Sequence, residues 1–379
     1  MIGLAYLESM QDELAIKAFQ KQIEINPYHE YAYNNLGRVY LRQRKYEEAT
    51  KWFAKQIEIS PLDKYAHDNL GIAYLEQHEY AEAVPELEQA ASLTQDNAEI
   101  QVRLGEAYLN LDQDEKAMDA FNKALKISAR PAVWNNISYH LTLKKTHLDA
   151  ARRYAESAVS STATTLRNFS LDQLASRNLG TTALLASSWD TLGWVEFADG
   201  NLDKAEKYVL AAWQLAQGSV AADHLGQIYE KRGDKEQAIH FYALAMNARR
   251  PEPETRSRLA ALAGGNDKAE AIIAKNHDEL TALRTIKLRN TLKQQGKADF
   301  FLLLTNGKGP EMSVDDVRFV NGDEKLKVFT EALRGVRYGQ TVPDETAVKI
   351  LRRGSLSCSA TAADCTLVLA LPGDVHSVD

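Results

Sequence analysis

The sequence Leu-Gly-Arg-Val-Tyr at residues 36–40 decides the fold of this chain. Its Gly belongs to a series in which the same residue returns every 34 positions: Gly3, Gly37, Gly71 and Gly105. A fixed period of this length indicates a repeat architecture, in which each repeat buries its apolar face against its neighbours. The 379 residues are 45% hydrophobic, which is ample for such a packed core.

Small residues recur at two places in each repeat. We expect each Gly to lie in the first helix of a hairpin and each later Ala in the second, as with Gly71 and Ala83. Small side chains there let the two backbones approach closely, so a larger residue would cost about 1–3 kcal/mol. Pro27 and Pro61 fall where the second helix must end, because proline cannot continue a helix.

This pattern resembles the tetratricopeptide repeat, a helix–turn–helix unit. The residues that carry the resemblance in one repeat are Leu36, Gly37, Tyr40, Ala49, Phe53 and Pro61. The resemblance implies a mostly α fold, a right-handed α-solenoid of about seven hairpins over residues 1–262. Four repeats fill residues 1–131, a degenerate fifth begins at Pro131, and the last two contain Gly193 and Gly226.

Two segments interrupt or follow the repeats. An insertion at about 160–188, rich in Ser, Thr, Ala and Leu, lies between the fifth and sixth repeats. We favour a longer hairpin that fills the joint between two sub-stacks, and the alternative is a binding insertion on one face. Residues 263–297 are expected to hold a capping or linking helix, running as one long helix over Asp267–Gln295.

Residues 298–379 change character and predict a small α+β module. Apolar runs at 300–304, 314–320, 348–357 and 366–371, with helical spacing at 324–336, give the order β-β-α-β-β. The module resembles the C-terminal domain of TonB-type energy transducers, through Val314, Val317, Phe319, Val320, Gly322, Leu326, Ala332, Leu333, Thr346 and Val348. The whole arrangement is similar to the C-terminal half of exported bacterial transglutaminase-like proteins, although the Cys-His-Asp region of that enzyme class is missing.

Charge and hydropathy exclude several classes of function. The net charge of −7 provides no basic footprint, so we expect no nucleic-acid partner. No apolar run approaches the roughly 20 residues that cross a bilayer. The first helix is cut short at Met1, so we expect the C-terminal piece of a longer protein or a truncated reading frame. The alternative is a natural start with a frayed first hairpin.

Cys358 and Cys365 are the only cysteines, and they stand between two expected strands. We favour a disulfide over free thiols, and metal binding is disfavoured because two ligands do not make a tetrahedral site. A disulfide implies an oxidising compartment. Together with the TonB-like resemblance it predicts a periplasmic or cell-envelope location, with the cytoplasm as the alternative. The Asn-Gly-Lys-Gly-Pro run around Lys308 is interpreted as a turn, because it lacks phosphate-loop spacing.

The candidate site is the concave groove, because the resemblance implies that the first helix of each hairpin faces it. An Asn amide both donates and accepts, which suits a peptide backbone, and Arg38 with Arg42 could hold a carboxylate. We expect no catalytic residue, metal or cofactor. The groove residues are Asn34, Asn35, Arg38, Arg42, Asn69, Ile72, Arg103, Asn136 and Trp194.

These observations predict a non-enzymatic interaction scaffold that binds a peptide segment of a protein partner in the groove. The alternative is a non-catalytic, substrate-positioning half of a larger cell-envelope enzyme whose catalytic domain lies upstream of Met1.

Overall fold

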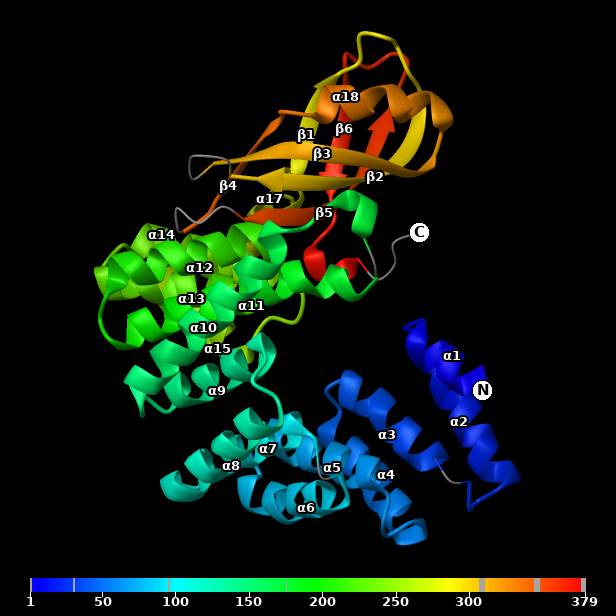
Figure 1. Ribbon diagram of the computed structural model, residues 1–379, viewed down its shortest axis with the longest axis vertical. Coiled ribbons are helices and arrows are strands. Elements are labelled where there is room, and N and C mark those ends of the chain that lie inside the picture. Colours follow the sequence, from blue (N-terminus) through cyan, green and yellow to red (C-terminus); the bar gives the residue numbers. More distant parts are fainter. Residues whose placement is uncertain are drawn as a thin grey trace. The chain divides into compact units, whose positions relative to one another are not determined.

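The computed structural model describes residues 2–29, 31–94, 96–174, 176–306, 311–343 and 348–375, with the backbone alone for 176–178. Over these residues the protein is mostly helical, and a smaller antiparallel sheet follows the helices (Figure 1). The chain divides into two compact units, Met1–Lys144 and Lys145–Asp379. The division therefore falls inside the solenoid that the sequence predicts over residues 1–262.

The first unit is a series of antiparallel helix hairpins that follows the 34-residue period. Its last helix, α9, begins at Pro131, where the fixed φ of proline suits the first turn of a helix. The helices are α1 (Ile2–Glu8), α2 (Asp12–Ile25), α3 (Ala32–Arg42), α4 (Tyr46–Ile59), α5 (Lys64–Glu76), α6 (Tyr80–Leu93), α7 (Ala98–Asn110), α8 (Asp114–Ile127) and α9 (Pro131–Leu143).

The small residues bring the helices of each hairpin into contact, as predicted. A Cβ placed on Gly37 would lie 2.6 Å from Cε1 of the Phe53 ring, so a larger residue there would have to displace the ring. Ala49 is fully buried beside Phe53 in the same apolar cluster. The spacing of Gly, Ala and Phe thus sets the packing of the hairpin directly.

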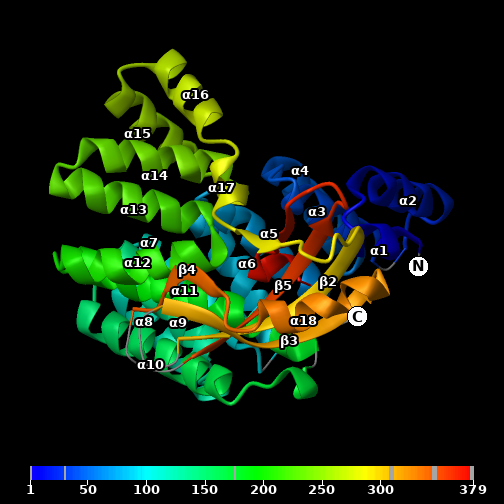
Figure 2. The same cartoon turned by 90° about the horizontal axis from the view of Figure 1, so that it is seen from above.

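The second unit continues the stack of hairpins. Figure 2 shows α11 to α16 side by side in chain order. An additional hairpin, α15 with α16, follows the seventh repeat. The helices are α10 (Leu148–Arg167), α11 (Ser176–Ala198), α12 (Leu202–Ala216), α13 (Ser219–Arg232), α14 (Lys235–Asn247), α15 (Pro253–Ala263), α16 (Asn266–Lys275) and the short α17 (Glu279–Ala282).

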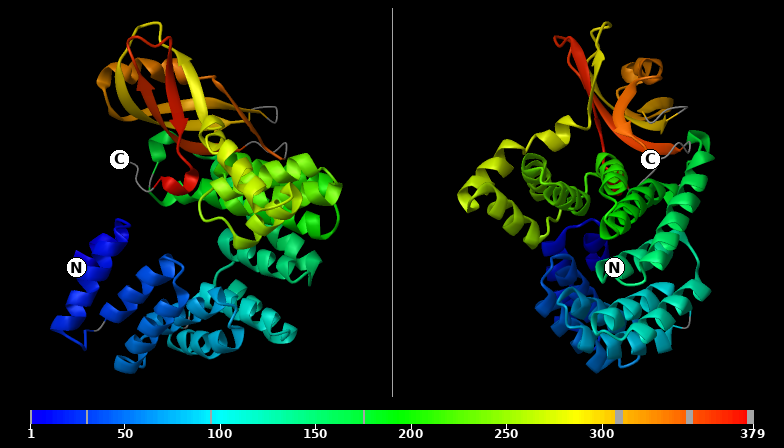
Figure 3. Two further views of the ribbon diagram at one scale, coloured as in Figure 1. Left: turned by 180° about the vertical axis from the view of Figure 1, so that it is seen from behind. Right: turned by 90° about the vertical axis from the view of Figure 1, so that its left-hand side faces the viewer.

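An antiparallel sheet with the order β1-β6-β5-β2-β3-β4 completes the second unit. It twists strongly, and the short helix α18 (Phe329–Leu333) packs against β3 (Figure 3). The four predicted strands are present, and β1 and β4 are additional edge strands. The strands are β1 (Thr285–Arg289), β2 (Gly296–Thr305), β3 (Glu311–Gly322), β4 (Arg337–Thr341), β5 (Lys349–Cys358) and β6 (Asp364–Leu369).

The insertion lengthens one hairpin and supports the sheet. α10 has 20 residues and α11 has 23, with a short turn of 3₁₀ helix at Leu171–Gln173 between them. These two helices form one long hairpin, and apolar residues of the insertion pack on the sheet. The shared cluster is Phe169, Leu171, Leu179, Phe301, Leu303 and Leu351.

The expected long helix over Asp267–Gln295 is wrong. The helix α16 ends at Lys275, and β1 begins at Thr285 and pairs with β6. Ile286 and Leu288 are two residues apart, which puts both on one face of a strand. Leu288 lies opposite Cys365 in the ladder. The expected helix over 324–336 is also shorter, because 3₁₀ turns occupy Glu324–Val328 and α18 ends at Leu333.

Candidate peptide-binding groove

A cavity of about 560 Å³ opens in the first unit between the first three hairpins. Its volume lies within the range of small-molecule and cofactor pockets, about 300–1,000 Å³. Four of the nine groove residues predicted from the sequence line it. The lining residues are Leu4, Phe19, Gln22, His29, Tyr31, Asn34, Asn35, Arg38, Tyr65 and Asn69.

Side-chain amides on α3 and α5 form the polar part of this cavity. Asn69 Nδ2 donates to Asn34 Oδ1 at 2.9 Å, and the Asn34 main-chain N–H donates to Gln56 Oε1 at 3.2 Å. Asn35 Oδ1 accepts from Arg38 Nη1 at 3.2 Å. Within the described part of the chain, Asn35 Nδ2 and Asn69 Oδ1 have no hydrogen-bond partner. One amide donor and one amide acceptor therefore remain for a ligand.

Two tyrosines add aromatic surface that the sequence analysis missed. Tyr31 is 44% exposed and Tyr65 is 58% exposed, and both line the cavity. They stand 34 residues apart, at the same place in successive repeats. The period could have identified them, since exposed aromatic residues are typical of interaction surfaces.

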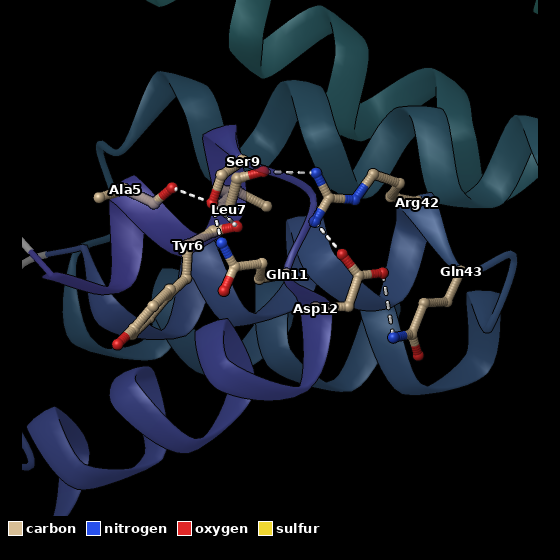
Figure 4. A network of polar contacts seen from close by, with 8 residues as sticks. All are labelled: Ala5, Tyr6, Leu7, Ser9, Gln11, Asp12, Arg42 and Gln43. Atoms are coloured by element: carbon tan, nitrogen blue, oxygen red, sulfur yellow. Dashed lines mark hydrogen bonds and ion pairs between the residues drawn. The ribbon is translucent and has the colours of Figure 1, made fainter.

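Arg42 does not stand beside Arg38 as a second open cation. It forms an ion pair with Asp12 of the first hairpin, and its Nη1 donates to the main-chain oxygen of Leu7 at 2.6 Å (Figure 4). Gln43 Nε2 donates to the other Asp12 oxygen, Oδ2, at 3.1 Å. The expectation that Arg38 and Arg42 together hold a carboxylate is therefore wrong, because Arg42 joins one hairpin to the next.

The remaining predicted groove residues lie outside this cavity. Ile72 is half-buried on α5, and Arg103 Nη1 pairs with Asp68 Oδ1 at 2.7 Å. Asn136 is exposed on α9. Trp194 belongs to the second unit, where it stacks on His224 with 3.8 Å between ring centroids. Within the first unit, Ile72, Arg103 and Asn136 are therefore not part of the cavity that holds the amides of α3 and α5.

Two titratable groups, Glu106 and His140, stand at the position in their repeats that Arg38 and Ile72 hold in the two preceding ones. Burial, with a smaller contribution from the Glu76 charge, raises the pKa of Glu106 to about 7. Burial lowers the pKa of His140 to about 4. His140 Nε2 lies 3.6 Å from Glu106 Oε2. Near neutral pH the imidazole is therefore uncharged, and the carboxyl is partly protonated.

Cys358 and Cys365 are joined by a disulfide that links the end of β5 to β6. Their Cα atoms are 4.4 Å apart, and the next pair in the ladder is Ser357 with Thr366. The bond therefore continues the register of the two strands.

The turn expected around Lys308, and Thr346 of the TonB-like pattern, lie outside the described residues.

Among the described helices, none combines the length and apolarity required to span a bilayer. Among the described side chains, no three His, Cys, Asp or Glu residues gather as metal ligands.

Sequence comparison identifies the repeats. Models described as tetratricopeptide repeat match residues 1–29, 28–96, 74–136 and 221–257. No curated protein matches the sequence at a significant level. These four matches lie within residues 1–257, so the resemblance of the C-terminal module to TonB-type domains and of the whole chain to transglutaminase-like proteins stays a prediction.

Solved structures are similar in fold. A tetratricopeptide repeat protein from Parabacteroides merdae has a TM-score of 0.55 and 14% identity, over 69% of this chain and 95% of that one. A structure of the APC/C hetero-tetramer Cut9–Hcn1 has a TM-score of 0.50 and 16% identity, and the match covers 69% of this chain and 48% of that one. MamA matches over 44% of this chain and 96% of its own, with 22% identity and a TM-score of 0.39. The matched segments of this chain are tetratricopeptide repeats, and its helices form a repeat solenoid followed by a small strand-rich module.

Proposed function

We propose that the first unit is a protein-interaction scaffold that binds an extended peptide segment of a partner in the cavity between α1, α3 and α5. Repeat solenoids present extended concave surfaces to their partners. The observation that carries this proposal is the hydrogen-bonded pair Asn34–Asn69 beside Arg38, in a cavity that Tyr31 and Tyr65 also line.

The chemistry of the cavity favours a peptide that is extended at this point. A residue in an extended strand presents its N–H and C=O side by side, and Asn69 Oδ1 and Asn35 Nδ2 match an N–H and a C=O. Arg38 is exposed and adds a positive charge at the same place. The partner segment should therefore carry an acidic side chain near the residue whose backbone the amides bind.

The groove also has electrostatic polarity along its length. The Arg38 end is basic, whereas Glu76 and Glu106 lie on α5 and α7, further along the same unit. A charged peptide should prefer one direction in such a groove, because like charges placed together are unfavourable. We propose that the acidic part of the partner segment faces α3.

Selection from a random peptide display library, with the purified full-length chain as bait, tests this function. Peptides selected on the wild type should bind an Asn35→Ala/Arg38→Ala variant about tenfold or more weakly. That variant lacks the amide that bonds the peptide backbone and the guanidinium that pairs with the acidic side chain. Asn136→Ala is the matched control, because Asn136 is an exposed amide of the same unit outside the cavity. Equal affinity for all three proteins would place recognition elsewhere.

We further propose that the chain works in an oxidising compartment, either periplasmic or at the cell envelope. The support is the disulfide between Cys358 and Cys365, since such bonds persist in oxidising environments and are rare where thiols are kept reduced.

A further inference from the structure

A second cavity, of about 280 Å³, lies inside the second unit between the helices and the edge strand β4. Its apolar walls come from Trp213 on α12, Phe241 on α14 and Tyr338 on β4, all of them buried. Trp213 and Phe241 meet edge to face, with 6.3 Å between ring centroids. The cavity therefore offers flat aromatic surfaces to a small ligand.

Two glutamines line this cavity with unmet hydrogen-bonding groups. Gln340 is 1% exposed, and neither its Nε2 nor its Oε1 has a partner among the described residues. Gln217 is 5% exposed, and its Nε2 donates to the main-chain oxygen of Leu280 at 3.1 Å. That bond fixes the orientation of the Gln217 amide, and its Oε1 has no donor within the described part of the chain.

The two glutamines are held in place by their surroundings. Gln214 Oε1 accepts from the main-chain N–H of Thr341 at 2.9 Å and from its hydroxyl at 3.1 Å. This contact ties the end of β4 to α12, and Gln340 is the residue before Thr341. Tyr338 and Gln340 share one face of β4, because they are two residues apart. The unmet groups therefore belong to a packed wall of the cavity.

Unmet buried polar groups are costly, about 1–3 kcal/mol each, so natural proteins satisfy them by protein, water or ligand. Among the residues that line the cavity, the unmet set is one amide donor group and two carbonyl acceptors; Arg352, which contacts Tyr338 but does not line the cavity, also has an unmet Nε and Nη2. Its complement is a ligand group with one carbonyl oxygen and two N–H bonds. A primary carboxamide is that group: its oxygen accepts from Gln340 Nε2, and its two N–H bonds reach Gln340 Oε1 and Gln217 Oε1.

The charges near the cavity favour a neutral carboxamide over a cation or an anion of the same shape. Arg352 is buried, and its guanidinium carbon lies 5.9 Å from the centroid of the Tyr338 ring, which disfavours a cation nearby. Arg352 would attract an anion, but an anion inside the cavity would also face the oxygens of Gln217 and Gln340 and the carboxylate of Glu279, which pairs with His240 at 3.2 Å on the cavity lining. An uncharged ligand avoids both penalties.

We propose that this cavity is a binding site for a neutral primary carboxamide on a flat or short apolar body. The source of the carboxamide is either a free small molecule or the side chain of a Gln or Asn residue on a partner. The site is independent of the peptide groove in the first unit, so either proposal can fail without the other.

A series of isosteric probes tests the proposal on the full-length chain by calorimetry and by indole NMR shifts. Benzamide should bind and should move the Trp213 resonance. Benzoate and benzamidine have nearly the same shape as benzamide, N,N-dimethylbenzamide is larger by two methyl groups, and each lacks part of the complement, so each should bind at least about tenfold more weakly. Tighter binding of benzoate or benzamidine would overturn the proposal, and so would the absence of benzamide binding, which would leave the cavity to water.

Gln340→Leu is the informative variant, because it removes the central amide and keeps the apolar volume. Its melting temperature should equal or exceed that of the wild type, since two unmet buried atoms disappear, and benzamide binding should weaken about tenfold or more. Unchanged binding in the folded variant would refute the proposed site. A blocked glutamine, N-acetyl-glutamine N-methylamide, distinguishes the source. If it binds more tightly than benzamide, a partner side chain is favoured, and the reverse order favours a small molecule.

Discussion

Asn69 donates a hydrogen bond from Nδ2 to Oδ1 of Asn34, at 2.9 Å, and so joins two successive hairpins through their side chains. Asn34 is 5% exposed, and its main-chain N–H is bonded to Gln56. The contact therefore has a structural part, which holds α5 against α3, besides its place in the proposed groove.

We expect Asn69→Ala to lower the free energy of unfolding by about 1 kcal/mol, because a buried acceptor loses its donor. Asn34→Ala should cost a similar amount. If the hydrogen bond is the cause, the double variant should cost clearly less than the two single changes added together. Urea unfolding of the four proteins measures this coupling. Strict additivity would mean that the two amides stabilise the chain independently.

A second prediction concerns the glycines of the repeat. A Cβ on Gly37 would meet the ring of Phe53 at 2.6 Å, and the ring is fully buried. Gly→Ala within a helix gains about 1 kcal/mol in propensity, whereas overpacking costs about 1–3 kcal/mol. Gly37→Ala should therefore lower the stability by about 1 kcal/mol.

Gly180 is the matched control for this change, because it lies inside α11 and has no atom within 4 Å of a built Cβ. Gly180→Ala should raise the stability by about 1 kcal/mol. Chemical denaturation followed by circular dichroism compares the two variants. A stabilising Gly37→Ala would show that the hairpin can relax around the added methyl group.

Several of these residues show which features of the fold and the groove could be predicted from the sequence. The period predicted the hairpins, the close approach of their two helices at Gly37, and the place of Asn34 and Asn69 on first helices, because each depends on positions that repeat. The role of Arg42 could not be predicted, because Asp12 competes for it from another hairpin and sequence spacing does not rank partners. The strand β1 was missed because the apolar positions Ile286 and Leu288 also fit the longer helical pattern.

The pH dependence of stability should reveal opposite effects of Glu106 and His140. Burial raises the pKa of Glu106 from 4.5 to about 7, so the unfolded chain loses this proton first and stability falls as pH rises through that window. Burial lowers the pKa of His140 from 6.5 to about 4. The unfolded chain holds that proton longer, so its contribution makes stability rise between pH 4 and 6.5.

The two contributions oppose each other between about pH 4.5 and 6.5, so the variants are more informative than the wild type. Glu106→Gln should leave the His140 contribution, and stability should rise with pH across that range. His140→Leu should leave the Glu106 contribution, and stability should fall. Thermal unfolding at closely spaced pH values measures both slopes. Parallel curves for the two variants would show that neither group has the pKa given by its burial.

The disulfide provides the last prediction, which bears on stability and compartment together. Cys358 and Cys365 close a short loop between β5 and β6, so the loss of chain entropy predicts a modest gain, about 2–3 kcal/mol. The double variant Cys358→Ser/Cys365→Ser should lose that amount in urea unfolding, and the reduced wild type should match it. Freshly isolated native protein should be lighter than its reduced form by the two hydrogens of one disulfide. Two thiols that alkylate at once in that sample would instead indicate a reducing compartment, and the proposed envelope location would lose its support.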